Sequence, residues 1–252
     1  MYFEQLILFV ISLVANLFSA FAGGGAGLIQ FPVLIFLGLP FSIALATHKI
    51  ASVALGVGAT LRNLKTHHLH RKQVLTIVGF GVPGVIVGAN IILAVPDREA
   101  EISLGILTIG LGLYSLFNPD LGMNKRDIKD TFWHRAGGGM VIFVIGALNG
   151  SLTSGTGLFV TLWLVRHYGM DYKLAVAYTL VLVGLFWNGT GAITLTLLTT
   201  VQWSWLPALL LGSLLGGYIG AHLAIVKGNR WIKRSYETIT LILGLKLIFG
   251  NL

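Results

Sequence analysis

Apolar segments recur from one end of this sequence to the other, and they constrain the fold more than any other feature. They lie at 5–22, 26–38, 42–61, 73–95, 102–118, 136–152, 156–165, 174–199, 203–226 and 231–249. Segments of about 20 apolar residues cross a bilayer as helices, and the mean hydropathy of the 252 residues is +0.84. The short alternating segments typical of a β-barrel do not occur in the sequence. We therefore predict an all-α polytopic membrane protein.

Composition excludes several classes of function. The chain has no cysteine, which excludes disulfides, thiol nucleophiles and cysteine-ligated metals. His67, His68 and His70 lie together in a basic connection, and we interpret them as solvated residues because a fourth ligand is missing. We therefore expect no metal and no cofactor.

The N-terminal segment lacks the positively charged start of a signal peptide, so we interpret it as a membrane segment and not as a cleaved signal peptide.

The positive residues predict the orientation in the membrane. The net charge is +8, and of the 17 Lys and Arg only Lys49, Arg98 and Lys246 lie outside four connections, at 62–72, 118–135, 166–173 and 227–234. Positive connections stay in the cytoplasm. We accordingly expect 37–41, 97–101 and 199–205 on the other side, and no binding of nucleic acid.

This orientation requires two hairpins within the membrane. Connections 118–135 and 166–173 are both predicted to be cytoplasmic, so the apolar stretch 136–165 enters and leaves on one side. The same argument applies to 5–38 and puts both chain termini outside the cytoplasm. The hairpins reverse at TSGTG (153–157) and GGGAG (23–27). The sequence leaves open whether they are re-entrant or fully spanning.

The two halves of the chain also resemble each other. GGGAGL at 23–28 matches TSGTGL at 153–158, and GVIVGAN at 84–90 matches GGYIGAH at 216–222. We predict two inverted repeats, each an interrupted hairpin plus three transmembrane helices, at 1–118 and 136–252, with a cytoplasmic linker at 119–135. Inverted repeats with interrupted helices are typical of secondary transporters, which bind substrate near the midplane of the membrane.

The glycine-rich breaks predict a site for a small anion. Broken backbone at membrane depth is tolerated only where it is buried in protein or lines a cavity. Glycine allows the reversal, and the helices that begin near Ala26 and Thr156 would point their positive N-termini at the protein centre. We predict that substrate contacts these breaks and the nearby Thr-His-Lys stretch: Gly23, Gly24, Gly25, Ala26, Gly27, Thr47, His48, Lys49, Thr153, Ser154, Gly155, Thr156 and Gly157.

Lys49 is the strongest single indication. It lies near the middle of its apolar segment, where a charge is costly and usually functional. A bound anion would compensate it, and pairing with a backbone carbonyl or a helix C-terminus is the alternative. Further polar residues near the breaks and in later segments either contact the anion or satisfy neighbouring backbone: Asn16, Ser19, Asn149, Asn188 and His222.

These motifs resemble the TauE/SafE family of bacterial membrane proteins, described as sulfite exporters or anion permeases. The resemblance covers nearly the whole chain and rests on the paired breaks, on SAFAGGGAGLIQFPVLIFLGLP and on ALATHKIAS. It implies transport of sulfite or a related sulfur oxyanion or organosulfonate. This chain departs from the pattern in its second half, where the break is TSGTG and the position equivalent to Lys49 is Leu180.

We conclude that the sequence favours a multi-pass secondary transporter of the bacterial inner membrane and not an enzyme. An anion channel with the same site is the first alternative. An intramembrane hydrolase is the second, with Ser154 as nucleophile and His222 as base. Which anion is carried, the direction, the coupling ion and the oligomeric state stay open.

Overall fold

The computed structural model describes residues 2–66, 68–91, 97–128, 131–152 and 155–249. Every regular element within these ranges is helical. In the first half the elements are α1 (Tyr2–Ala22), a 3-10 turn η1 (Ala26–Leu28), α2 (Gln30–Phe36), α3 (Phe41–Asn63), α4 (Arg71–Ile91) and α5 (Asp97–Leu116). The predicted all-helical class is therefore confirmed for the described residues.

The second half follows a similar order with one irregular helix. Its elements are α6 (Phe132–Leu152), α7 (Thr156–His167), α8 (Tyr172–Tyr178), the π-helix η3 (Thr179–Trp187), α9 (Asn188–Leu198), a 3-10 turn η4 (Trp203–Trp205), α10 (Leu206–Lys227) and α11 (Asn229–Phe249). Elements α8, η3 and α9 run on without a break and form one apolar stretch of 27 residues.

Five described helices are long and apolar enough to cross a membrane. They cover Phe3–Ala22, Phe41–Asn63, Arg71–Ile91, Tyr172–Leu198 and Trp203–Lys227. Large apolar side chains are exposed along many of the helices, as expected where lipid replaces water. This confirms the prediction of a polytopic membrane protein.

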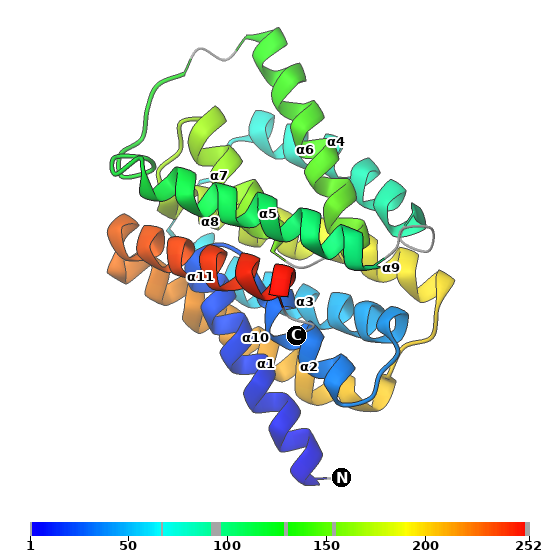
Figure 1. Cartoon of the computed structure of the whole chain (residues 1–252). Helices are drawn as coiled ribbons and strands as arrows, with labels where there is room; N and C mark the ends of the chain where they lie inside the picture. The colour runs from blue at the N-terminus through cyan, green and yellow to red at the C-terminus, as the bar shows by residue number, and fades with distance from the viewer. Residues whose placement is uncertain (1, 67, 92–96, 129–130, 153–154, 250–252) are drawn as a thin grey trace.

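Long-range packing joins helices from the two halves of the chain. Helix α1 packs along α10, α4 along α6, and α5 along α11, while α3 contacts both α10 and η3–α9 (Figure 1). Small residues allow these close approaches. A Cβ at Gly216 would lie 2.5 Å from the Leu13 carbonyl oxygen, and one at Gly84 would lie 2.2 Å from that of Phe143.

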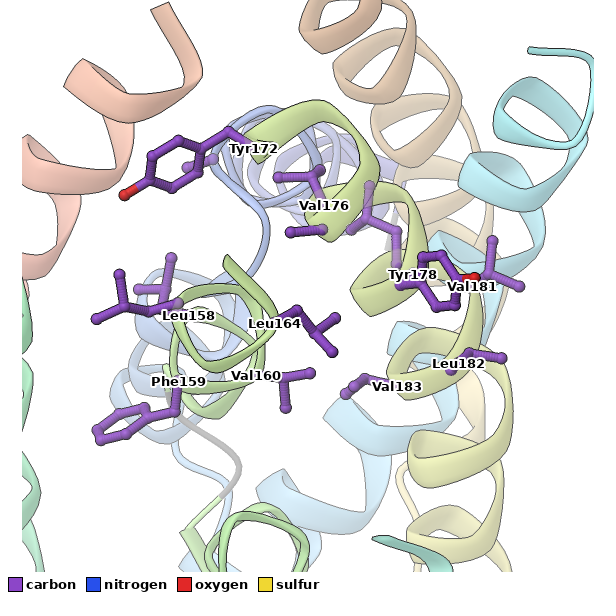
Figure 2. Close-up of a cluster of buried hydrophobic side chains, with 14 of the residues drawn as sticks. Leu158, Phe159, Val160, Leu164, Tyr172, Val176, Tyr178, Val181, Leu182 and Val183 are labelled. Atoms are coloured by element: carbon purple, nitrogen blue, oxygen red, sulfur yellow. The ribbon is translucent and has the colours of Figure 1, made fainter. Parts of the chain in front are cut away.

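An apolar cluster fills the space between α7 and the α8–η3 stretch. Figure 2 shows Leu158, Val160 and Leu164 of α7 near Val176 and Val183 of the longer helix. All five side chains are buried. This packing fixes α7, and with it the second chain break, against η3.

Connections predicted to share a side of the membrane lie together. The Arg126 N–H donates to the Gly169 carbonyl at 2.7 Å, and Asn229 Nδ2 donates to the Met123 carbonyl at 2.8 Å. At another point, Gln5 Nε2 donates to the Ser204 carbonyl at 2.8 Å, which brings the N-terminal end of α1 to the connection at 199–205. The grouping agrees with the predicted arrangement of connections.

Candidate functional site

The two chain breaks, by which we mean the glycine-containing interruptions between helices at 23–27 and 153–157, contact each other through Gly24 and Gly157. A Cβ at Gly24 would lie 2.6 Å from both the Gly157 carbonyl carbon and the Leu158 nitrogen. Gly23, Gly24 and Gly25 have φ values of +89°, +144° and +105°, which side chains rarely adopt. Glycine is therefore required in the first break both for conformation and for space.

The second break has one residue in the same kind of conformation. Gly155 has a φ of +74° and directly precedes α7, which begins at Thr156 as predicted. Thr153 and Ser154, which we also predicted to contact substrate, lie outside the described residues.

The helix after the first break begins later than the predicted start near Ala26. Residues Ala26–Leu28 form a 3-10 turn, and α2 begins only at Gln30. Pro32 explains the late start, because proline lacks an N–H group and is tolerated in the first turn of an α-helix but not further inside it.

A small cavity opens between the breaks. Its volume is about 40 Å³, and a cavity needs roughly 10–15 Å³ to hold one water molecule. It therefore has room for about three waters or a small anion. Its walls include most of the residues that we predicted from the sequence: Ser19, Gly24, Gly25, Ala26, Gly27, His48, Asn149, Thr156, Gly157 and Asn188.

Lys49 lies behind the cavity wall and not on it. Its Nζ donates to the Asn149 carbonyl at 2.8 Å, to Asn149 Oδ1 at 2.7 Å and to Asn188 Oδ1 at 3.2 Å. The side chain is fully buried, and it forms no ion pair with a carboxylate among the described residues. Asn149 lies in the last turn of α6, where carbonyls lack helical partners. Lys49 therefore makes the pairing with a helix C-terminus that the sequence offered as the alternative to a bound anion.

Asn149 connects Lys49 to the start of the next helix. Its Nδ2 donates to Thr156 Oγ1 at 2.7 Å, while its Oδ1 accepts from Lys49. Asn149 and Asn188 both line the cavity. The ammonium of Lys49 is therefore separated from the cavity by only two amide side chains.

Other predicted residues have structural partners away from the cavity. Thr47 Oγ1 accepts from the Gln202 N–H at 3.1 Å, and the Gly23 carbonyl accepts from Thr161 Oγ1 at 2.7 Å. His222 is exposed, and its Nδ1 accepts from Arg62 Nε at 3.0 Å.

Asn16 belongs to a separate buried polar cluster. Its Nδ2 lies within hydrogen-bonding distance of the Ser12 carbonyl, of Gln30 Oε1 and of Ser213 Oγ. This cluster joins α1 to α2 and α10, so Asn16 supports packing around the first hairpin and does not line the cavity.

Sequence reasoning missed part of the cavity wall. Ser52 and Leu55 come from α3, and Thr179, Leu180, Val183 and Gly184 come from the π-helix η3. Ser52 Oγ lies 3.1 Å from His48 Nε2, and its position one turn after His48 was the signal that could have found it. The π-helix has no comparable signal in the sequence, although such segments often mark functional sites.

Comparison with known proteins places this chain among membrane transporters. It is 28% identical over 97% of its length to a "Probable membrane transporter protein" of Haemophilus influenzae, of which it covers 94%. It is 26% identical over 97% of its length to "Probable membrane transporter protein YfcA" of Escherichia coli strain K12, of which it covers 90%. It is 24% identical over 98% of its length to "Probable membrane transporter protein YunE" of Bacillus subtilis strain 168, of which it covers 98%.

No solved structure matches the chain. The family model for the sulfite exporter TauE/SafE matches residues 8–247, a range that includes both chain breaks, Lys49 and the cavity between them. The resemblance seen in the sequence is confirmed, and the chain belongs to the sulfite exporter TauE/SafE family of membrane proteins.

Proposed function

We propose that this membrane transporter is a secondary transporter that carries a small anion of the sulfite class and binds it in the cavity between the two chain breaks. The observation that carries the proposal is the buried Lys49 ammonium, which lies behind a small polar cavity and has no carboxylate partner among the described residues. The family name supplies the sulfur oxyanion as the class of substrate. The cavity volume of about 40 Å³ favours sulfite over bulky organosulfonates.

Backbone and side-chain donors would hold the anion. Gly24, Gly25 and Gly27 contribute main chain to the cavity wall, and Thr156 contributes the first residue of α7. Backbone N–H groups in glycine-rich turns and at helix starts favour anions. His48 Nδ1 is buried and has no hydrogen-bond partner among the residues that the structure describes. When Nε2 accepts from Ser52, Nδ1 carries the proton and can donate to the anion.

Lys49 would supply the compensating charge. A buried ammonium with only neutral acceptors is costly within a membrane, and an anion beyond Asn149 and Asn188 would reduce that cost. The flexible side chain of Lys49 can also contact the anion directly, if Nζ replaces a hydrogen bond to an amide oxygen with one to an oxygen of the anion.

The inverted-repeat arrangement belongs to the same proposal. We assign 1–118 and 136–252 as the two repeats and 119–135 as a cytoplasmic linker. Supporting this, α1 packs on α10 as α6 packs on α4, and α5 packs on α11. Helix α7 has 12 residues, or about 18 Å at 1.5 Å per residue, which is shorter than the hydrocarbon core of about 30 Å. If the C-terminal end of α7 lies at the membrane surface, its N-terminal end and the break before it lie inside the membrane.

Counterflow of labelled sulfite in proteoliposomes tests the function. Unlabelled sulfite inside the vesicles should drive saturable uptake of label, and excess sulfate, thiosulfate, an alkylsulfonate and chloride should rank by how well they compete. We expect sulfite to compete best. Flux that follows voltage without counterflow would indicate an anion channel, and no flux with any of these anions would remove the sulfur oxyanion as substrate.

We further propose that the protein lies in the bacterial inner membrane with its C-terminus outside the cytoplasm. The four positive connections support this orientation. The hydrolase alternative gains no support from His222, because this residue is exposed and is engaged by Arg62.

A further inference from the structure

A second, larger cavity lies at the end of α5. Its volume is about 390 Å³, and its wall includes Tyr114, Phe117, Asp120, Arg126 and Arg166. None of these residues lines the cavity between the chain breaks. Pockets of 300–1,000 Å³ are typical of sites for small molecules, so this cavity is large enough for a ligand of its own.

Two guanidinium groups line this cavity, and neither has an acidic partner within the described part of the chain. Arg126 Nη2 donates to the Val165 carbonyl at 3.1 Å and to the Arg166 carbonyl at 3.5 Å. These bonds orient the guanidinium and leave Nε and Nη1 without an acceptor among the described residues. The Arg166 side chain has no hydrogen bond or ion pair within the described residues. Among the described residues, Asp120 is the one acidic residue on the wall, and it pairs with neither arginine. The cavity therefore carries a net positive charge.

The main chain around the cavity is fixed. The Arg126 N–H donates to the Gly169 carbonyl at 2.7 Å, and the Tyr172 N–H donates to the Gly122 carbonyl at 2.9 Å. These bonds hold the connection after α5 against the connection after α7. Both connections are among those that the positive residues assign to the cytoplasm.

An exposed apolar face of α5 leads to this cavity. Ile106, Leu113 and Phe117 are 60%, 39% and 81% exposed, and spacings of seven and four residues put them on one face of the helix. This face extends about 16 Å at 1.5 Å per residue, and it ends at Phe117 on the cavity wall. In a bilayer such a face contacts acyl chains.

We propose that this cavity binds the headgroup of an anionic phospholipid of the cytoplasmic leaflet. The phosphate lies between Arg126 and Arg166, and an acyl chain follows Ile106, Leu113 and Phe117 along α5. Guanidinium groups bind phosphate with two parallel hydrogen bonds, and basic pockets at the cytoplasmic face of membrane proteins bind anionic headgroups. The proposal is independent of the substrate that the protein transports.

Lipid titration of the purified full chain tests the proposal. The melting temperature is measured in neutral detergent with added phosphatidylglycerol, phosphatidylcholine or inorganic phosphate, and bound lipid is counted by native mass spectrometry. We expect stabilisation by phosphatidylglycerol only. Arg166→Gln should weaken phosphatidylglycerol binding about fivefold, and Arg126→Gln should weaken it by a similar factor. Asp120→Asn should strengthen it.

Arg230→Gln is the matched control, because Arg230 is exposed in another positive connection and lies outside the cavity. Arg166→Gln removes no side-chain hydrogen bond or ion pair within the described residues, so we expect the variant to fold, and its melting temperature without added lipid checks this. Unchanged phosphatidylglycerol binding in Arg166→Gln, or an equal loss in Arg230→Gln, would overturn the proposal. Stabilisation by inorganic phosphate alone would assign the cavity to a soluble anion in place of a lipid.

Discussion

The ammonium of Lys49 in α3 lies 2.7 Å from Asn149 Oδ1 and 2.8 Å from the Asn149 carbonyl at the end of α6. One residue of the first half of the chain thus provides the positive charge at the break of the second half. In the repeats predicted from the sequence, the position equivalent to Lys49 is Leu180, which lines the cavity directly. The proposed site is therefore asymmetric, with one charge and not two.

Removing the charge of Lys49 should reduce transport strongly. Hydrogen bonds to charged groups contribute about 1.5–3 kcal/mol, so we expect Lys49→Ala to lower the apparent affinity for the anion by at least about tenfold. Lys49→Gln keeps a donor for Asn149 but has no charge, and it should lose transport to a similar extent. Counterflow in proteoliposomes measures both variants.

The folded state of these variants needs a separate measurement. Size-exclusion elution and melting temperature report folding, and Lys246→Ala is a control lysine variant at an exposed position of α11. Normal transport by folded Lys49→Ala would show that the site is wrong.

An internal carboxylate should replace the anion. Asn149→Asp would place a negative charge beside Lys49 Nζ, where the amide oxygen now lies at 2.7 Å. The resulting ion pair compensates the buried ammonium, so we expect a folded protein that no longer binds the transported anion. Asn90→Asp, at an exposed position of α4, is the control. Retained counterflow in Asn149→Asp would mean that the anion does not respond to the charge of Lys49.

Gly24→Ala should destabilise the protein more than Gly38→Ala. Both glycines have positive φ, +144° and +98°, so alanine is strained at each by about 1–2 kcal/mol. A Cβ at Gly38 meets no atom within 4 Å, whereas one at Gly24 meets the Gly157 backbone at 2.6 Å. Overpacking against backbone adds roughly 1–3 kcal/mol. Melting temperatures of the two variants give the difference, and equal losses would argue against close contact of the breaks.

Much of this structure could be predicted because membrane helices follow from the sequence pattern. Apolar length predicted the spans, and GGGAG at 23–27 and TSGTG at 153–157 predicted where helices are interrupted. Inspection of the charges indicated that Lys49 needs a partner inside the protein. The pair of Glu237 and Lys233, at 3.1 Å, also agrees with their spacing of four residues.

Other features depend on tertiary packing and had no sequence signal. The π-helix Thr179–Trp187 is such a case, because its residues read as an ordinary apolar helix. The place of Lys49 behind the cavity wall is another, since it depends on where Asn149 and Asn188 lie after folding. Polar residues such as Asn16 and His222 fit a binding role in the sequence equally well, and only the structure shows their other partners.

The stacked pair of His134 and His167 should make stability depend on pH. Their ring centroids are 3.7 Å apart, and each Nε2 donates to the other residue's carbonyl at 3.1 Å. Burial lowers the pKa of His167 below its ordinary value of 6.5. The hydrogen bond to the His134 carbonyl opposes this shift, whereas the charges of the His134 ring and Arg166 lower the pKa further. The unfolded chain therefore takes up the proton first, and stability falls as pH drops through about 6.5.

His167→Gln should remove part of this pH dependence. The melting temperature between pH 7.5 and 5.5 should fall less steeply in the variant than in the natural protein, whatever the absolute values. His68→Gln, at an exposed position of the connection 62–72, should leave the slope unchanged. Identical slopes for His167→Gln and the natural protein would show that His167 does not contribute to the pH dependence.

Cysteine labelling should show residue 65 inside the cell and residue 204 outside. The chain has no cysteine, so Lys65→Cys, Ser204→Cys and a cysteine added after residue 252 each carry one label, and residues 65 and 204 are exposed. An impermeant maleimide should label position 204 and the C-terminus in intact cells, and position 65 only after permeabilisation. This follows because the positive connections stay in the cytoplasm and three helices of the second repeat separate 166–173 from the C-terminus. A reversed pattern would invert the protein in the membrane but keep both hairpins. Labelling of positions 65 and 204 from the same side would contradict the hairpin arrangement itself.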